Sequence, residues 1–150
     1  MAKGKEDAVT QLPDEIVKLL DKLVVKGPYG ALLGVELVDA AEDCVRLRLP
    51  YRREVTTLVD TVHGGAISGL VDCAATASFW AIPEITPGSR GTTIGFSINF
   101  LSAGRGKDLV ATARVRRRGR EISTGEVTVR DAEGKEIAFA LVTYKLSAAA

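Results

Sequence analysis

Apolar residues recur at helical spacing near the start of the chain, in residues 13–26, with lysines and acids on the opposite face. This pattern predicts an amphipathic surface helix. Pro13 suits the first turn of a helix, and Gly27 followed by Pro28 suits its end. The apolar positions are Ile16, Leu19, Leu20, Leu23 and Val24.

The pattern becomes alternating in residues 34–50, where apolar and arginine side chains follow one another. Such alternation is typical of half-buried strands, and it predicts two strands that turn near residues 41–43. Residues 51–62 are then expected to form a loop. The alternating positions are Val45, Arg46, Leu47, Arg48 and Leu49.

A long apolar segment follows in residues 64–81. It contains few polar side chains and stops before Pro83, which predicts a buried helix. Asp72 is the only charged residue between Gly65 and Ile82. Because a buried charge is costly unless it is paired or used, this carboxylate calls for a chemical explanation.

Four further segments have strand patterns, at residues 92–101, 108–118, 122–130 and 135–146. The last two flank a short turn with Gly134 at a position suited to positive φ, which predicts a hairpin. We expect the four strands to follow one another as a meander. A sheet of hairpins is antiparallel, and a helix that is apolar nearly all round must be covered on several sides. The sequence therefore predicts an α+β fold in which an antiparallel sheet wraps around a long central helix.

Composition fits a single domain over residues 1–150, with its core at about residues 30–146. The chain is 46% hydrophobic and 26% charged, with a formal net charge of +1, which gives no general attraction to nucleic acid or an anionic membrane. Residues 1–10 lack the apolar core of a secretory signal, and the segment 66–82 is too short and polar to span a bilayer. We expect a cytoplasmic protein with no nucleic-acid or membrane partner.

The two cysteines, Cys44 and Cys73, stand alone in segments predicted to be buried, without the paired spacing of metal ligands. Free thiols in a reducing compartment are the expected state. No metal site is predicted.

Candidate chemistry lies at the start and in the middle of the long helix. Gly64 and Gly65 would present unpaired backbone N–H groups, reinforced by the helix dipole, which is the outline of an oxyanion hole. Asp72 supplies a carboxylate suited to act as a nucleophile or as a general base on water. Structural alternatives remain: glycine pairs open many helices, a lone acid can be a hydrogen-bonding group, and His63 can cap the helix or pack against it.

Distance adds a constraint on this site. Gly64 and Asp72 are eight residues apart, or ~12 Å along a helix axis. A base and an oxyanion donor must each come within about 3 Å of the same reacting group, so one chain cannot supply both. Two antiparallel copies of the helix, side by side across a two-fold axis, would place Gly64 of one copy opposite Asp72 of the other. We therefore expect an obligate homodimer with two sites at its interface.

Several segments together carry a resemblance to a known family. They are His63-Gly64-Gly65 with Asp72, residues 97–101, residues 115–120 and residues 127–135. Over residues 30–146 the chain resembles the hotdog-fold acyl-CoA thioesterases of the PaaI-like and 4-hydroxybenzoyl-CoA thioesterase type. The resemblance implies hydrolysis of an acyl-CoA or aryl-CoA thioester to a free acid and coenzyme A, without a metal or redox cofactor. It also implies an assembly of at least a homodimer, with a homotetramer expected.

The resemblance also implies roles for particular residues. Asp72 corresponds to the catalytic carboxylate, and Gly64 to the residue whose backbone amide polarises the thioester carbonyl. Its neighbours in the His63–Gly65 motif are grouped with it, His63 as a catalytic and Gly65 as a substrate-binding candidate. Thr76 corresponds to a position that helps to orient the attacking water, and Thr93 to a polar substrate-site position.

Two positions depart from the family pattern. Thr57 stands where family members commonly carry Asn or Gln, and Asp60 replaces a usual glycine. Thr57 is kept as a catalytic candidate, although its hydroxyl is shorter than an amide side chain. This leaves open an alternative function, an acyl-CoA-binding sensor or carrier that does not hydrolyse its ligand. A hydratase on the same fold is disfavoured, because such enzymes use an Asp/His pair on a hydration motif and His63 is the only histidine.

Arginines are candidates for the phosphates of coenzyme A, because planar guanidinium groups bind phosphate well. The resemblance favours this role over a solvated strand face. No aromatic residues interleave with the basic run, so nucleic-acid binding is not supported. The arginine candidates are Arg90, Arg116, Arg118 and Arg120. The acyl group has candidate contacts in Phe79, Trp80, Phe96 and Phe100, for which core packing is the alternative.

Overall fold

The computed structural model describes residues 10–147 of the chain. Residues 1–9, which include most of the segment used to argue against a secretory signal, and residues 148–150 lie outside this range. The helical elements are α1 (Asp14–Leu20), a π-helical turn η1 (Asp21–Val25), α2 (Pro28–Leu33), a short 3-10 turn η2 (Arg53–Val55) and α3 (Gly64–Trp80). The strands are β1 (Glu36–Ala41), β2 (Cys44–Leu49), β3 (Arg90–Phe100), β4 (Leu109–Arg117), β5 (Ile122–Asp131) and β6 (Glu136–Ser147).

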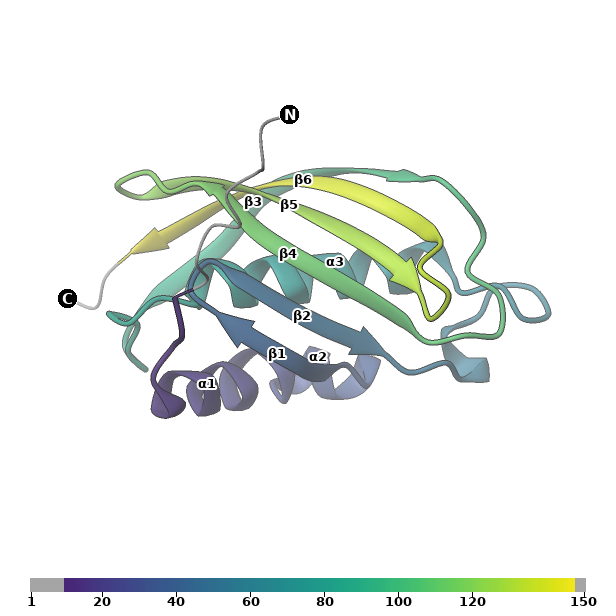
Figure 1. Cartoon of the computed structure of the whole chain (residues 1–150), viewed down its shortest axis with the longest axis horizontal. Helices are drawn as coiled ribbons and strands as arrows, with labels where there is room; N and C mark the ends of the chain where they lie inside the picture. The colour runs from purple at the N-terminus through teal and green to yellow at the C-terminus, as the bar shows by residue number, and fades with distance from the viewer. Residues whose placement is uncertain (1–9, 148–150) are drawn as a thin grey trace, which may run out of the picture.

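The strands form one antiparallel sheet in the order β1-β2-β4-β5-β6-β3, and this sheet curves around α3 (Figure 1). The predicted α+β fold, with an antiparallel sheet around a central helix, is confirmed. The two-strand unit after residue 34 and the hairpin of the last two strands are also present. Gly134 turns that hairpin with a φ of 81°, the conformation for which glycine was expected there.

The predicted four-strand meander is wrong at its first step. β3 pairs with β6 and not with β4, and β4 lies beside β2. The connection between β3 and β4 therefore crosses from the sheet edge to its middle, and Gly104 in this connection accepts a hydrogen bond from Val62 just before α3. Alternation marks a segment as a strand but does not specify which strand lies beside it, because pairing is a non-local property.

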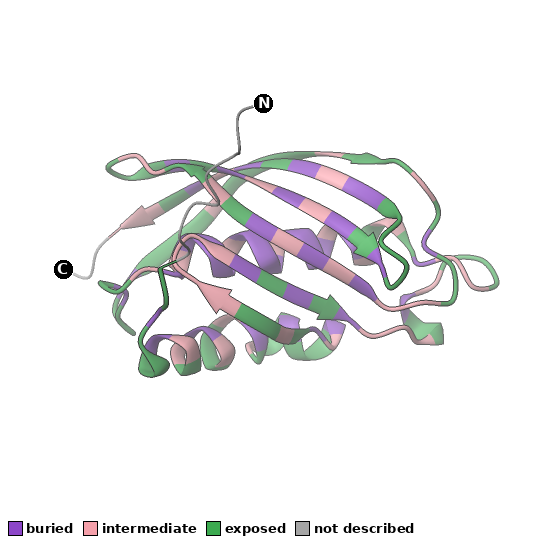
Figure 2. Cartoon of the chain, in the orientation of Figure 1, coloured by how far each residue is buried: buried purple, intermediate pink, exposed green. Residues whose placement is uncertain are grey.

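Helix α3 is buried almost all round, and the sheet strands alternate between buried and exposed positions (Figure 2). Its sheet-facing residues are mostly small or aliphatic, so the helix can approach the strands closely. Ala111 and Ala113 of β4 and Ala140 of β6 are fully buried on the sheet face that covers it. Burying this apolar surface holds helix and sheet together. Among residues 10–147, no helix is both long enough and apolar enough to cross a membrane.

The amphipathic helix predicted at residues 13–26 is present but interrupted. After α1 the chain makes a π-helical turn, in which the Lys26 amide bonds to the Asp21 carbonyl. The extra residue in this turn rotates the buried face, so Ile16, Leu20 and Val25 are buried while Leu23 is 40% exposed. The predicted stripe through Leu23 is therefore wrong.

Helix α2 was not predicted. It begins where the first helix was expected to end, because Gly27 takes the N-cap position and Pro28 the first helical position. Both helices and the turn between them lie along one side of the molecule, where η1 and α2 contact α3 (Figure 1). This arrangement brings the N-terminal segment next to the middle of the central helix.

Candidate functional site

The start of α3 is capped by His63. Its side chain accepts a hydrogen bond from the Gly65 amide, with 2.7 Å between Nδ1 and the nitrogen. Gly65 is therefore already bonded. The Gly64 amide, at the first helical position, has no partner within the helix, so it is the glycine amide left for a ligand oxygen. Phe100 of β3 lies close to Gly64, because a Cβ at Gly64 would be 3.2 Å from the Phe100 ring.

The capping role predicts a stability effect for His63. Replacing it with alanine should lower the free energy of unfolding by about 1 kcal/mol, the usual cost of losing an N-cap side chain. Asparagine presents an oxygen near the same place and should keep most of that stability. Urea denaturation measures the free energy of unfolding of both variants, and steady-state hydrolysis measures their turnover. Equal activity loss in His63→Asn and His63→Ala, with stability retained only by the former, would assign His63 a direct chemical role instead.

Asp72 lies on the half-buried face of α3, two turns beyond Gly64. The Thr93 hydroxyl of β3 donates a hydrogen bond to Asp72 Oδ1 at 2.7 Å. One carboxylate oxygen is thus positioned by Thr93, and the other can act on a ligand or a water. Thr76 lies one helix turn further along the same face, so the structure brings together Asp72, Thr76 and Thr93 as the sequence predicted.

Asp72 and Thr76 open onto a pocket of about 290 Å³. α3 contributes Asp72, Thr76 and Trp80 to it, and the N-terminal segment forms the opposite wall with Leu23, Pro28 and Tyr29. Tyr144 of β6 and Gly91 of β3 complete the lining. Five of these lining residues were not predicted from the sequence as site residues: Leu23, Pro28, Tyr29, Tyr144 and Gly91. They were missed because α2 and the pairing of β3 with β6 were not predictable from local patterns.

A second pocket, of about 400 Å³, lies at the start of α3 and includes His63 and Gly65. Tyr29 lines both pockets, which otherwise have different lining residues. Its hydroxyl packs against Gly69, where a Cβ would overlap it. Within one chain the Gly64 end and the Asp72 end are therefore distinct places.

Burial controls the ionisation of two groups in the Asp72 pocket. It raises the pKa of the Cys73 thiol to about 11, with a smaller contribution from the nearby Asp72 charge. Burial also raises the pKa of Tyr144, and hydrogen bonding with Trp80 and Thr76 opposes this shift. Both groups are therefore neutral at physiological pH. Among residues 10–147, no cluster of histidine, cysteine and acidic side chains is placed to hold a metal ion. Both cysteines are free.

Thr57 belongs to the Gly64 end of the molecule and not to the Asp72 pocket. It is exposed in the loop before α3, where its amide bonds to the Thr61 carbonyl. Asp60 in the same loop lies 3.5 Å from the Arg105 guanidinium. Within one chain, neither residue is brought to Asp72.

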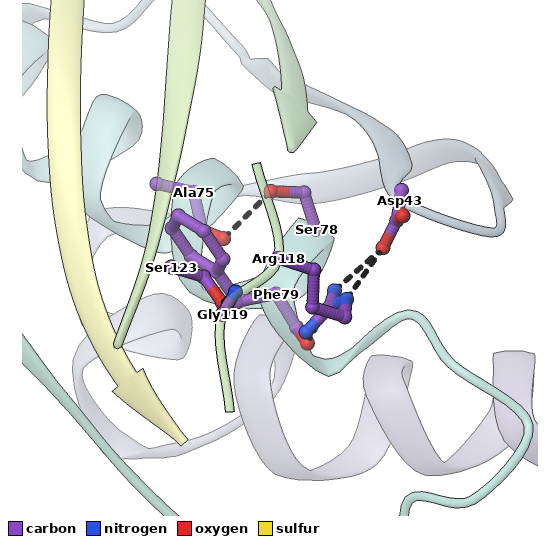
Figure 3. A network of polar contacts seen from close by, with 7 residues as sticks. All are labelled: Asp43, Ala75, Ser78, Phe79, Arg118, Gly119 and Ser123. Carbon is purple, nitrogen blue, oxygen red and sulfur yellow. Dashed lines mark hydrogen bonds and ion pairs between the residues drawn. The ribbon is translucent and has the colours of Figure 1, made fainter. Parts of the chain in front are cut away.

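The arginines are dispersed. The Arg118 guanidinium donates to Asp43 and to the Phe79 carbonyl at the C-terminal end of α3, as Figure 3 shows. A cation at this end of a helix is stabilised by the dipole. This intramolecular role differs from the phosphate-binding role predicted for Arg118, because its Nε and Nη2 donors already have acceptors.

The other basic candidates keep free donors. Arg116 sits at a bulge in β4 and is 3.7 Å from Glu126. Arg90 bonds to the neighbouring carbonyls of Gly88 and Ser89. Arg120 is exposed beside a pocket of about 170 Å³ that Arg118 also lines. Arg118 and Arg120 line this pocket together, whereas Arg116 and Arg90 line two other pockets.

Comparison with known proteins gives a consistent result. The sequence signature of the thioesterase superfamily matches residues 60–138. The chain is 29% identical over 134 residues to acyl-coenzyme A thioesterase 13 of Homo sapiens, which covers 87% of this chain and 91% of that protein.

Solved structures share the fold. The PaaI protein of the E. coli phenylacetic acid degradation operon has a TM-score of 0.71 at 18% identity, over 88% of this chain and 93% of its own. A Streptococcus pneumoniae thioesterase protein solved with coenzyme A has a TM-score of 0.67 at 22% identity, over 77% of this chain and 87% of its own.

Proposed function

Because the chain belongs to the thioesterase superfamily and is a thioester hydrolase, we propose that it hydrolyses acyl-CoA or aryl-CoA thioesters at a site shared by two subunits. Asp72 acts as the nucleophile or as the general base on water, and the Gly64 amide of the other subunit polarises the thioester carbonyl. The observation that carries the proposal is the Asp72 carboxylate, held by Thr93 in an open pocket two helix turns from the unpaired Gly64 amide. The relative named for acyl-coenzyme A and the neighbour solved with coenzyme A support the choice of substrate.

The exposed edge of the sheet supports the proposed dimer. β3 is an edge strand of 11 residues, and most of its residues are exposed, including the apolar Ile94, Phe96 and Phe100. A long apolar edge strand without a partner is prone to pair with another strand. We infer that it pairs with β3 of a second copy.

The position of the two-fold axis can be tested against the site. Thr93 lies level with Asp72 through their hydrogen bond, and Phe100 lies level with Gly64. Antiparallel pairing of two β3 strands about a centre between Phe96 and Ser97 sets Thr93 of one copy opposite Phe100 of the other. The same pairing sets Asp72 beside Gly64 of the second copy, which is the arrangement that thioester hydrolysis requires.

In this site the chemistry proceeds without a cofactor. The carbonyl oxygen of the thioester accepts a hydrogen bond from the Gly64 amide, which stabilises the negative charge that develops on it. Asp72 takes the proton of a water as that water attacks, or attacks directly, and Thr76 lies near enough to help position the water. When water attacks, the carbon–sulfur bond then breaks to release the coenzyme A thiolate and leave the free acid. When Asp72 attacks directly, the same bond breaks to leave a mixed anhydride on Asp72, which water then hydrolyses to the free acid and the Asp72 carboxylate.

The direct test is a substrate panel. We expect the purified protein to release free coenzyme A thiol from at least one short-chain, medium-chain or aryl-acyl-CoA, measured with a thiol reagent. Binding of an unreactive acyl-CoA thioether without hydrolysis of any thioester would contradict the proposal. It would favour a protein that binds acyl-CoA without hydrolysing it. This alternative is motivated by Thr57, which stands where family members commonly carry Asn or Gln.

A further inference from the structure

The far end of the Asp72 pocket is closed by two aromatic side chains. The Trp80 indole donates a hydrogen bond to the Tyr144 hydroxyl, with 2.8 Å between nitrogen and oxygen. The Tyr144 ring stacks on Phe79, with ring centres 4.9 Å apart and planes at 7°. Tyr144 is only 2% exposed. Tyr144 is therefore held both by the hydrogen bond from Trp80 and by stacking on Phe79.

Gly91 of β3 completes this closure. A Cβ at Gly91 would overlap both the Tyr144 hydroxyl and the Trp80 indole nitrogen. The aromatic pair therefore lies directly against the β3 backbone and leaves no passage between them. Helix α3, β3 and β6 together bound the pocket at this end.

The length of the compartment follows from helix geometry. Asp72, Thr76 and Trp80 follow one another at four-residue spacing, so they share one face of α3. Trp80 is ~12 Å beyond Asp72 along the axis. In the opposite direction Tyr29 covers Gly69, less than one turn before Asp72. An acyl group whose carbonyl lies at Asp72 thus meets an aromatic wall in either direction along the helix.

The pocket volume agrees with a small occupant. At about 290 Å³, the space is at the lower limit of ordinary small-molecule sites. Its side walls include the apolar Leu23, Val24 and Pro28 from the N-terminal segment. These surfaces suit a short aliphatic or aromatic group.

We propose that the hydrogen-bonded Trp80–Tyr144 pair is the end wall of the acyl pocket and excludes long-chain acyl groups. This inference rests on the proposed function. It makes Trp80 and Tyr144 specificity-determining residues rather than catalytic ones. Their removal should therefore change which acyl chain is accepted.

The test compares acyl chains within each variant. We expect wild type to show a kcat/KM for hexanoyl-CoA at least ~10-fold above that for dodecanoyl-CoA, as expected when a pocket rejects extra methylene groups. Trp80→Leu should raise the dodecanoyl-to-hexanoyl ratio by at least ~10-fold. A ratio cancels any general loss of activity or stability. Phe139→Leu is the matched control, because Phe139 is a half-buried aromatic residue of the same strand as Tyr144 on its opposite face, and it should keep the wild-type ratio.

An unchanged ratio in Trp80→Leu would overturn the inference while leaving the proposed function intact. If wild type hydrolyses none of the thioesters, the proposed function fails, and the same ratio is then read from calorimetric Kd values for hexanoyl and dodecanoyl thioethers of coenzyme A. Trp80→Phe, which keeps an aromatic ring but loses the larger indole and its N–H, replaces Trp80→Leu if the latter does not fold. Equal Kd ratios in wild type and variant would equally overturn the inference.

Discussion

Replacing Asp72 with asparagine should lower kcat by about 100- to 10,000-fold, the range associated with a general acid–base group. Asparagine is nearly isosteric, and its side-chain oxygen can still accept the Thr93 hydrogen bond seen at 2.7 Å. The change thus removes the charge and the basicity while it keeps the local packing. Steady-state hydrolysis of the preferred acyl-CoA measures the effect.

Two further measurements separate chemistry from folding. The free energy of unfolding of Asp72→Asn should stay close to that of wild type, because the new side chain keeps its partner. Thr93→Val should leave Asp72 in place but remove its hydrogen bond. We expect kcat to fall about 10-fold, which is equivalent to ~1.4 kcal/mol. Comparable turnover in wild type and Asp72→Asn would remove Asp72 from the chemistry.

Mixing two inactive variants should restore activity if each site draws on both subunits. Gly64→Pro removes the amide hydrogen, and proline is tolerated at the first position of a helix. Asp72→Ala removes the carboxylate. Each variant alone should be close to background. In a hybrid dimer of the two, one site combines an intact Gly64 with an intact Asp72, and the other site has neither.

The expected recovery is quantitative. Random assembly makes half of the dimers hybrid, and one of the two sites in each hybrid is intact, so the mixture should show about a quarter of wild-type activity. Gly64→Ala is the control, because it adds a Cβ near Phe100 but keeps the amide hydrogen. Absence of recovery, with hybrid dimers demonstrated by differential tagging, would place Gly64 and Asp72 in the same functional unit of one chain and contradict the shared site.

The helix signals in this chain are strong because they are local. The apolar run from Gly64 and the proline beyond its end suffice to predict α3, which the structure bounds at Gly64–Trp80. The interruption at Asp21–Val25 was missed, because a single π-helical turn leaves no mark in apolar spacing until the buried residues are known. For this reason Leu23, which was predicted to face the core, is exposed, and Val25 is buried instead.

Some residues of the candidate site could likewise be predicted from local sequence, and others could not. Asp72 stood out from sequence as one charge in an apolar helix, and Gly64 as a bare helix start. Tyr144 and Gly91 could not be connected with them, because their closeness to Asp72 depends on β3 lying beside β6. The engagement of Arg118 with Asp43 likewise depends on the turn between β1 and β2 lying over the end of α3.

The sequence alone determined the class of fold and pointed to candidate residues for the chemistry, because periodicity, helix ends and an isolated charge are properties of neighbouring positions. The tertiary structure decided which strand forms the exposed edge, what surrounds Asp72 and which aromatic residues close its pocket. Those features arise from contacts between segments far apart in the chain, and burial selects among them only when the whole sheet is assembled around α3.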